Sequence, residues 1–243
     1  MATGTSYVSA RLRRYLGSCG SSLSNRRTAP VFDSLNAAHN DLIGIIGGLI
    51  VGFTFGSIPF GYLLVRMKTG DDVRLSGSGN IGATNVKRVL GKRAGIATLF
   101  LDVAKGAGGT FTAVHVGIVV LGTQQPVWGA AGALGTVLGH CYTPWLGLRG
   151  GKGVATLLGA FALLVPVPTA VGAGVLVVVG AIGRMISLAS LAGSVALVCT
   201  AWFRAEPSYS LVATLLAAIV IFWRHRENIG RIKRGEEAKL GKA

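Results

Sequence analysis

The sequence predicts an all-α integral membrane protein, a polytopic helical bundle of about seven transmembrane or half-spanning helices. Apolar residues make up 51% of the 243 positions, and only nine residues are acidic. The first long apolar run, residues 42–65, has no charged side chain and exceeds the length needed to cross a hydrocarbon core of roughly 30 Å. The 37 glycines suit such a bundle, because small residues let helix backbones approach closely in a membrane.

The later apolar runs have the same character and are interrupted only by Asp102, Lys105 and His115. Asp102 and Lys105 are three positions apart on a helix that otherwise excludes charge, so we expect them to pair inside the bundle. Prolines 166 and 168 divide one long run into two short helices, because proline cannot continue a helical hydrogen-bond ladder. Helices are therefore expected within residues 42–65, 96–120, 127–139, 154–181 (divided at the prolines), 185–203 and 209–223.

The distribution of basic residues predicts the orientation of the bundle. If residues 42–65 run from outside to inside, nearly all basic residues of the connections fall on one face, and the opposite connections carry only Arg204. The positive-inside rule places the basic face in the cytoplasm. We expect a multi-pass protein of the cell inner or plasma membrane, with its N-terminus outside and its C-terminus and active site in the cytoplasm.

Three regions differ in composition. Residues 1–40 are rich in serine and arginine and lack apolar periodicity, which favours a disordered or mistakenly included N-terminal extension over an organelle transit peptide. The membrane domain is expected over residues 41–237, and residues 238–243 form a short basic tail. The three cysteines suggest no disulfide framework.

The first polar segment, residues 75–88, is rich in glycine, hydroxyl and amide side chains. Its glycines match the G-x-G-x-x-G pattern of dinucleotide-binding proteins, but no buried strand precedes them, so that interpretation fails. Glycines still let backbone N–H groups converge on an anion. The candidate side-chain donors are Ser78, Asn80, Thr84 and Asn85, with Arg88 supplying positive charge. A flexible solvated loop is the alternative.

The second polar segment, residues 139–156, resembles a nucleotide-binding P-loop around Lys152. The resemblance fails because Leu146 stands in the first glycine position and Gly153 where a magnesium-binding serine or threonine belongs. A glycine-rich turn that leads into a helix still directs donors at an oxyanion, and Lys152 is the strongest candidate phosphate ligand. His140 is either an acid or base beside this site or simply hydrogen-bonded in the bundle.

The third polar segment, residues 224–237, follows the last apolar helix. If the helix continues, His225, Asn228 and Arg231 lie along one side of it. Alone, the segment could also anchor anionic lipid headgroups. Ser187 follows another short basic connection on the same predicted face, and its hydroxyl could join the pocket.

Five stretches carry a family resemblance: Gly56-Ser-Ile-Pro-Phe-Gly, Gly77-Ser-Gly-Asn-Ile-Gly-Ala-Thr-Asn-Val, Leu101-Asp-Val-Ala-Lys-Gly, Arg149-Gly-Gly-Lys-Gly-Val-Ala-Thr and His225-Arg-Glu-Asn-Ile-Gly-Arg. Over roughly residues 42–237 the chain resembles the bacterial acyl-phosphate:glycerol-3-phosphate acyltransferases, the PlsY family. The resemblance implies acyl transfer from acyl phosphate to the 1-hydroxyl of sn-glycerol 3-phosphate, giving lysophosphatidic acid and inorganic phosphate in phospholipid biosynthesis.

Carried over position by position, the resemblance implies a site of seven polar side chains with one backbone contribution from Gly150. The side chains are Ser78, Thr84, Arg88, Lys152, Ser187, His225 and Asn228. We assign catalytic roles to Ser78, Lys152, His225 and Asn228 and substrate binding to the others, together with Asn80. Departures from the family pattern are mild, since Arg149 stands where lysine is commoner.

An acyl phosphate is already activated, so the predicted chemistry needs no covalent nucleophile, metal or cofactor. The His-x4-Asp pair of thioester-dependent acyltransferases is absent. The hypothesis is that a substrate phosphate oxygen accepts the hydroxyl proton, with His225 as the competing base. A transporter for a phosphorylated metabolite and a scaffold that binds anionic lipid are the alternative functions. The expected partners are the two substrates and the lipid bilayer, without nucleic acid, and the expected state is a monomer.

Overall fold

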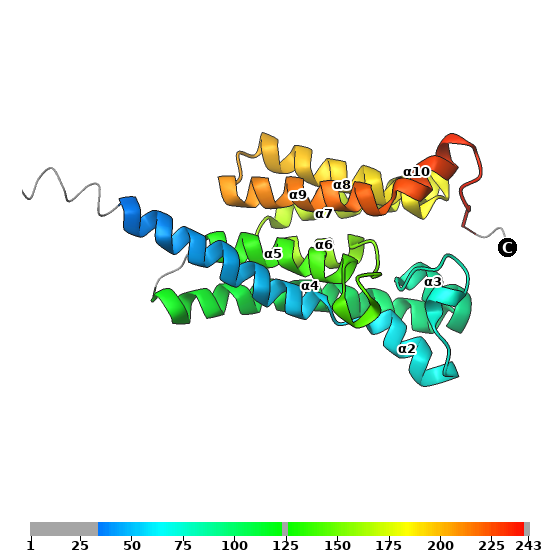
Figure 1. Cartoon of the computed structure of the whole chain (residues 1–243). Coiled ribbons are helices and arrows are strands. Elements are labelled where there is room, and N and C mark those ends of the chain that lie inside the picture. Colours follow the sequence, from blue (N-terminus) through cyan, green and yellow to red (C-terminus); the bar gives the residue numbers. More distant parts are fainter. Residues whose placement is uncertain (1–33, 123–125, 241–243) are drawn as a thin grey trace, which may run out of the picture. The chain divides into compact units, whose positions relative to one another are not determined.

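The computed structural model of the chain describes residues 34–122 and 126–240, and within these ranges it contains helices and no strand (Figure 1). Residues 34–56 form the first helix. The later α-helices are α2 (Phe60–Thr69), α3 (Ala83–Leu90), α4 (Lys92–Leu121), α5 (Pro126–Cys141), α6 (Val154–Ala162), α7 (Pro166–Gly183), α8 (Ile186–Phe203), α9 (Ser208–Arg224) and α10 (Arg226–Lys233). There are also two short 3₁₀ turns. η1 (Val73–Leu75) ends where the first polar segment begins, and η2 (Pro144–Leu146) lies within the second.

The chain divides into two compact units, residues 1–43 and 44–243, and all the polar motifs lie in the second. Within the first unit, residues 34–43 are helical. Residues 34–40 of the predicted extension are therefore helical, while the domain boundary at residue 40 stays a prediction. The rest of that predicted extension, residues 1–33, lies outside the described residues.

The predicted all-α membrane architecture is confirmed. Within the described residues, four helical stretches are long and apolar enough to cross a membrane: Ser34–Thr69, Lys92–Leu121, Pro166–Gly183 and Ile186–Phe203. A fifth results if α9 and α10, which meet at a bend of 59°, count as one broken span. The number seven stays a prediction, because α5 and α6 have only 16 and 9 residues.

The first predicted helix, residues 42–65, is interrupted rather than continuous. The helix that begins at Ser34 ends before Ser57, and α2 starts again at Phe60 after Pro59. Proline has no N–H to continue the ladder, which explains the break. The buried Ser57 carbonyl at the break accepts a hydrogen bond from Thr143 Oγ1 at 2.6 Å. The break therefore lies beside the start of the second polar segment.

Close backbone contacts confirm the structural use of glycine in the second unit. A Cβ atom at Gly52 would lie only 2.0 Å from the carbonyl oxygen of Gly132 in α5, and one at Gly56 would lie 2.0 Å from that of Thr136. A side chain at either position would force the backbones apart. Small residues therefore set the spacing between residues 44–56 and α5.

A buried apolar cluster joins α5, α6 and α9. Val137 and Cys141 of α5 pack with Leu157 and Phe161 of α6 and with Ile221 near the end of α9. This core fixes the end of α5, the start of α6 and the end of α9 near one another. The second and third polar segments leave the bundle from these three helix ends, so the core brings them together.

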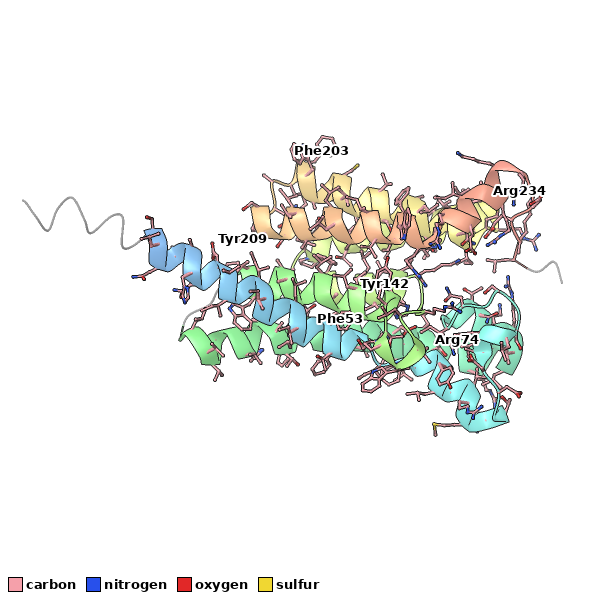
Figure 2. All side chains as sticks on the ribbon, viewed as in Figure 1. Phe53, Arg74, Tyr142, Phe203, Tyr209 and Arg234 are labelled. Atoms are coloured by element: carbon pink, nitrogen blue, oxygen red, sulfur yellow. The ribbon has the colours of Figure 1, made fainter. Side chains whose placement is uncertain are left out.

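The second unit has chemically distinct ends. Figure 1 shows α7, α8 and α9 side by side, with α10 continuing from one end of α9. In Figure 2, Arg74 and Arg234 lie at the end that carries α3 and α10, whereas Phe203 and Tyr209 lie toward the opposite end. The polar segments therefore gather at one end of this unit, as their composition predicted.

Candidate active site

A chain of hydrogen bonds that runs from Lys152 to Glu237 connects four separate parts of the sequence. Lys152 Nζ donates to Asn228 Oδ1 at 2.5 Å, and Asn228 Nδ2 donates to Glu237 Oε1 at 2.7 Å. Ser187 Oγ donates to the same carboxylate oxygen at 2.7 Å, and Arg231 Nε donates to Glu237 Oε2 at 2.8 Å. We call these five residues the Lys152 cluster. Three of them, Lys152, Ser187 and Asn228, are predicted site residues.

The glycine turn before Lys152 is held by both its amides and its carbonyls. Arg224 Nε donates to the Gly151 carbonyl at 3.0 Å, and its Nη2 donates to the Gly150 carbonyl at 2.8 Å. The Gly150 and Gly151 N–H groups donate to the carbonyls of Cys141 and His140 at 3.2 and 2.9 Å. The predicted backbone contribution of Gly150 to substrate binding stays a prediction, and in this structure both its N–H and its carbonyl bond within the protein. Gly150 fixes the turn that positions Lys152.

Burial and neighbouring charges change the pKa of Lys152. Partial burial lowers its pKa to about 8, the nearby carboxylate of Glu237 opposes the decrease, and Arg231 and Arg224 add to it. An ammonium group in such a position is poorly hydrated, and two guanidinium groups lie near it. The arrangement favours an incoming anion that would neutralise Lys152 and Arg231 together.

His225 lies at the bend between α9 and α10. Its ring is 2% exposed, and Nδ1 is 2.8 Å from the carbonyl oxygen of Ile221. A carbonyl only accepts, so Nδ1 carries the hydrogen and Nε2 of the neutral ring is left as an acceptor. The helix does not continue through His225, because α10 starts at Arg226 after the 59° bend, so the condition for placing His225 on one side with Asn228 and Arg231 is not met. Asn228 and Arg231 still share the α10 face that meets Glu237.

The first polar segment folds around Asn85. This buried side chain accepts from the Ser78 N–H at 2.8 Å and donates from Nδ2 to the carbonyls of Val73 and Ser76 at 3.0 and 2.9 Å. Its three bonds to loop backbone leave no role as the anion donor that the sequence suggested. Asn85 instead shapes the loop that presents Ser78.

Replacing Asn85 by alanine should destabilise the protein by about 1 to 3 kcal/mol, because three buried backbone groups lose their partner. Thermal unfolding of the purified protein in detergent would measure the change. Thr84→Ala is the matched control, since Thr84 is exposed on the same helix. Equal unfolding temperatures for the two variants would contradict the structural role of Asn85.

The remaining predicted residues of the first segment lie on an open surface. Ser78, Thr84 and Arg88 are exposed, and half-buried Asn80 accepts a hydrogen bond from the Gly82 N–H at 2.8 Å. Across residues 34–122 and 126–240, no hydrogen bond or ion pair joins these four to the Lys152 cluster. They therefore form a separate polar group in the structure.

Arg74, which the sequence analysis gave no site role, connects the first two polar segments. Its Nη1 donates to the carbonyl of Leu146 at 2.9 Å, and its Nη2 forms an ion pair with Asp72 at 2.6 Å. Arg74 holds the pKa of the Asp72 carboxyl below its ordinary value by hydrogen bonding to it. The contact fixes the two loops against each other. The chain gives no local signal for this contact because Arg74 and Leu146 are 72 positions apart.

The predicted pairing of Asp102 with Lys105 is confirmed. Their side chains are buried and 2.9 Å apart, and Lys105 Nζ also donates to the carbonyl of Ile58 at 2.8 Å. His140 Nδ1 lies 3.6 Å from Asp102, which is too far for a good hydrogen bond. These residues support the helix break at residues 57–59 from inside the bundle.

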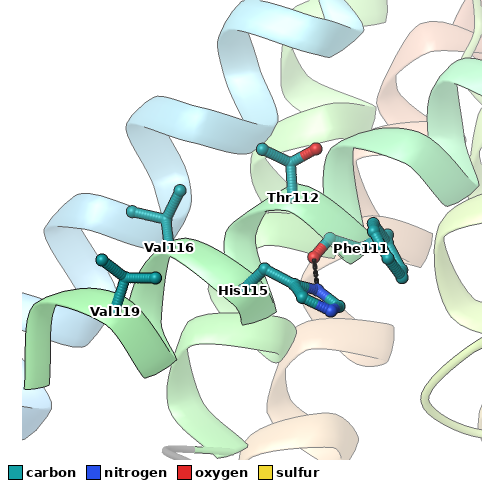
Figure 3. A pocket seen from close by; sticks show the side chains of 5 residues that line it. All are labelled: Phe111, Thr112, His115, Val116 and Val119. Carbon is teal, nitrogen blue, oxygen red and sulfur yellow. Dashed lines mark hydrogen bonds between the residues drawn. The ribbon is translucent and has the colours of Figure 1, made fainter. Parts of the chain in front are cut away.

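A surface hollow on α4 contains none of the predicted site residues. Figure 3 shows it lined by Phe111, Thr112, His115, Val116 and Val119, with His115 bonded to the carbonyl of Phe111 within the same helix. Its walls are mostly apolar, as expected for a helix surface facing lipid. Among the described residues, no group of three His, Cys, Asp or Glu side chains is arranged to hold a metal ion.

Comparison with known proteins identifies the family. The sequence model described as "Glycerol-3-phosphate acyltransferase" matches residues 46–235. The chain belongs to this family. The match spans the first two polar segments and the third as far as residue 235, and it confirms the resemblance indicated by the sequence motifs.

Curated relatives share this sequence over most of their length. The glycerol-3-phosphate acyltransferase of Myxococcus xanthus (strain DK1622) is 45% identical over 193 residues, covering 79% of this chain and 97% of the relative. That of Anaeromyxobacter sp. (strain K) is 43% identical over 200 residues, covering 81% and 98%.

Two crystal structures of PlsY (YgiH), an integral membrane glycerol 3-phosphate acyltransferase, have the same fold. The glycerol 3-phosphate form matches with a TM-score of 0.72 and 34% identity over 81% of this chain and 96% of that one. The lysphosphatidic acid form matches with a TM-score of 0.71 and 33% identity over 81% and 95%. The similarity establishes this chain as a multi-pass membrane protein.

Proposed function

We propose that this protein transfers a fatty acyl group from acyl phosphate to the 1-hydroxyl of sn-glycerol 3-phosphate, releasing lysophosphatidic acid and inorganic phosphate. The observation that carries the proposal is the Lys152 cluster, in which a hydroxyl, an amide and a guanidinium donate to one carboxylate, and the Lys152 ammonium donates to the oxygen of that same amide, Asn228. The two related crystal structures are described as the glycerol 3-phosphate form and the lysphosphatidic acid form of that protein.

The chemistry requires binding and alignment more than an added reagent. The glycerol hydroxyl oxygen attacks the acyl carbonyl carbon and forms an ester bond. The bond from that carbon to the phosphate oxygen breaks, and the leaving phosphate keeps the electron pair. The hydroxyl proton passes to a phosphate oxygen. Holding the two anionic substrates in register is the main source of rate enhancement in such a reaction.

The residues divide between the two substrates by position. In this proposal Lys152, Ser187 and Asn228 bind one phosphate group, because Ser187 and Asn228 already donate to a carboxylate and Lys152 is hydrogen-bonded to Asn228 beside it. Ser78, Asn80, Thr84 and Arg88 contribute to the second phosphate from the first polar segment. Arg224 and Gly150 position Lys152 through the glycine turn.

The basic end of the bundle faces the cytoplasm in this proposal, and the protein acts as a monomer in the cell inner or plasma membrane. The basic residues of the connections support this orientation. The N-terminus would then lie outside. Reporter fusions at each end would test the orientation.

A donor comparison tests the reaction. Purified protein is given glycerol 3-phosphate with one of three acyl donors: acyl phosphate, acyl-coenzyme A or acylated acyl carrier protein. Both phosphate and lysophosphatidic acid are measured. We expect product only with acyl phosphate, with phosphate and lipid released in equal amounts above the rate without glycerol 3-phosphate. Product from a thioester alone would exclude the proposed donor, and phosphate transport without acyl transfer would indicate a carrier.

Replacing His225 by glutamine should retain a rate within about tenfold of the parent if a substrate phosphate accepts the proton, whereas loss of a protein base typically costs about 10² to 10⁴-fold. Glutamine keeps a hydrogen-bond donor but cannot accept a proton near neutral pH. The measurement is kcat with acyl phosphate and saturating glycerol 3-phosphate. His115→Gln, at an exposed histidine of α4, is the control. A fall of about 10³-fold with unchanged glycerol 3-phosphate binding would establish His225 as the base.

The value of kcat/KM for glycerol 3-phosphate should also decrease at alkaline pH. The pKa of Lys152 is lowered to about 8 by burial, so the side chain is protonated below that pH and neutral above it. We therefore expect kcat/KM for glycerol 3-phosphate to decrease as pH rises through about 8. Lys152→Arg should remove this alkaline decrease, because a guanidinium stays charged. The same decrease in the arginine variant would assign it to another group.

A further inference from the structure

Within the Lys152 cluster, three side chains donate hydrogen bonds to a carboxylate of the protein itself, that of Glu237. Glu237 accepts hydrogen bonds from Ser187, Asn228 and Arg231 at 2.7 to 2.8 Å. Its side chain is only 8% exposed, although it comes from the C-terminal segment beyond α10. Two of its three donors are side chains proposed to bind a substrate phosphate.

The segment that carries Glu237 is anchored on both sides. Gly235 adopts the left-handed conformation (φ 72°), which turns the chain back after α10, and the Glu236 N–H donates to the carbonyl of Arg231 at 2.9 Å. Farther on, the Leu240 N–H donates to the Arg184 carbonyl at 2.6 Å, and Arg184 Nε donates to the Leu240 carbonyl at 3.1 Å. We call residues 234–240 the C-terminal strap. It joins α10 to the start of α8 across the site.

The strap holds a charged carboxylate in the cluster. Burial raises the pKa of Glu237, but hydrogen bonds from Ser187, Asn228 and Arg231 outweigh that effect and keep it below its ordinary value. A carboxylate and a phosphate are both oxyanions and require the same N–H and O–H donors. The donors of Ser187 and Asn228 cannot serve both, and a phosphate placed beside Glu237 would be repelled by it.

We propose that Glu237 is an affinity-determining residue that competes with phosphate groups for the side-chain donors of Ser187, Asn228 and Arg231. Its carboxylate satisfies the donors of the empty site, and an entering phosphate displaces it together with the strap. On product release the carboxylate returns, which prevents inorganic phosphate from remaining bound to Lys152. The inference rests on the proposed function in taking Ser187 and Asn228 as phosphate ligands.

Phosphate binding to a charge-neutral variant tests the competition. Calorimetric titration of detergent-purified Glu237→Gln with inorganic phosphate and with glycerol 3-phosphate should show about tenfold tighter binding than the parent, because the competing charge-assisted bonds are weakened. Glu236→Gln is the matched control. It removes the same charge one position away, where the exposed carboxylate pairs with Arg234. An affinity of Glu237→Gln equal to or weaker than that of Glu236→Gln would overturn the proposal.

A second measurement uses the unmodified chain and does not depend on how well the variant folds. Trypsin can cleave the strap after Arg234 and Lys239. If phosphate displaces Glu237, saturating inorganic phosphate or glycerol 3-phosphate should accelerate cleavage at these two sites several-fold, with cleavage elsewhere as the internal reference. Slower or unchanged cleavage would show that Glu237 organises the bound site instead of competing with the ligand.

These readouts separate the inference from the proposed reaction. Both are made without an acyl donor, so they report phosphate binding alone. Tight phosphate binding with strap release, but without acyl transfer, would refute the reaction and leave the competition standing. Acyl transfer without strap release would support the proposed reaction and refute the competition by Glu237.

Discussion

Lys152→Ala is expected to reduce kcat/KM with acyl phosphate and glycerol 3-phosphate by about 10²-fold or more, as loss of a preorganised charge donor does in other enzymes. Lys152 supplies the ammonium of the cluster, and its neighbours Arg231 and Arg224 do not reach the same Asn228 oxygen. In a partly buried site, a phosphate that loses such a partner has no water to replace it.

The control for this variant is Lys92→Ala, which removes the same charge from an exposed position at the start of α4. It should keep the parental rate. Both variants are compared for the amount inserted in the membrane and for thermal unfolding, so that folding defects are separated from catalysis. A Lys152→Ala rate within twofold of the parent would refute the assignment of Lys152.

Asn228→Asp should have the second largest effect, a decrease in kcat/KM of about 10²-fold, since hydrogen bonds to charged groups contribute about 1.5 to 3 kcal/mol. The new carboxylate would stand where Oδ1 now lies 2.5 Å from Lys152 Nζ, and it would neutralise the charge required for phosphate. It would also replace the amide donor to Glu237 by a repelling oxygen.

Lys233→Gln changes the net charge by the same amount from an exposed position on α10, and it should change kcat/KM little. In the Asn228→Asp variant the alkaline decrease should also move to higher pH, because a neighbouring carboxylate favours the ammonium form of Lys152. An activity within threefold of the parent, without a shift in the alkaline decrease, would contradict the role of Asn228.

Patterns local in the sequence predicted much of the fold. Apolar runs marked the helices, and two oppositely charged residues three apart on one apolar helix were enough to predict the Asp102–Lys105 pair. The helix through residues 42–65 was wrong in one respect, because its break at residues 57–59 is stabilised by contacts from distant residues. Lys105 reaches the Ile58 carbonyl from 47 positions away, and Thr143 reaches Ser57 from 86.

The candidate site also has some features that local sequence patterns predicted and others that depend on distant residues. Residue types and glycine spacing predicted that Lys152 and its glycine turn serve an anion, since those properties reside in a few neighbouring positions. The same reasoning misassigned Asn85, whose amide bonds to the backbone of its own loop. Whether an amide or a backbone N–H is free for a substrate depends on the carbonyls and amides packed against it. Sequence composition does not report that occupancy.

Local properties of adjacent residues were sufficient to identify the membrane class and the approximate positions of the apolar helices, and to predict phosphate-directed chemistry. Which donors meet depends on the tertiary structure. Lys152 and Asn228 are 76 positions apart, and Ser187 and Glu237 are 50 apart. The buried core shared by α5, α6 and α9 and the turn at Gly235 bring these groups within hydrogen-bond distance. Such contacts depend on packing between helices, which no local pattern encodes.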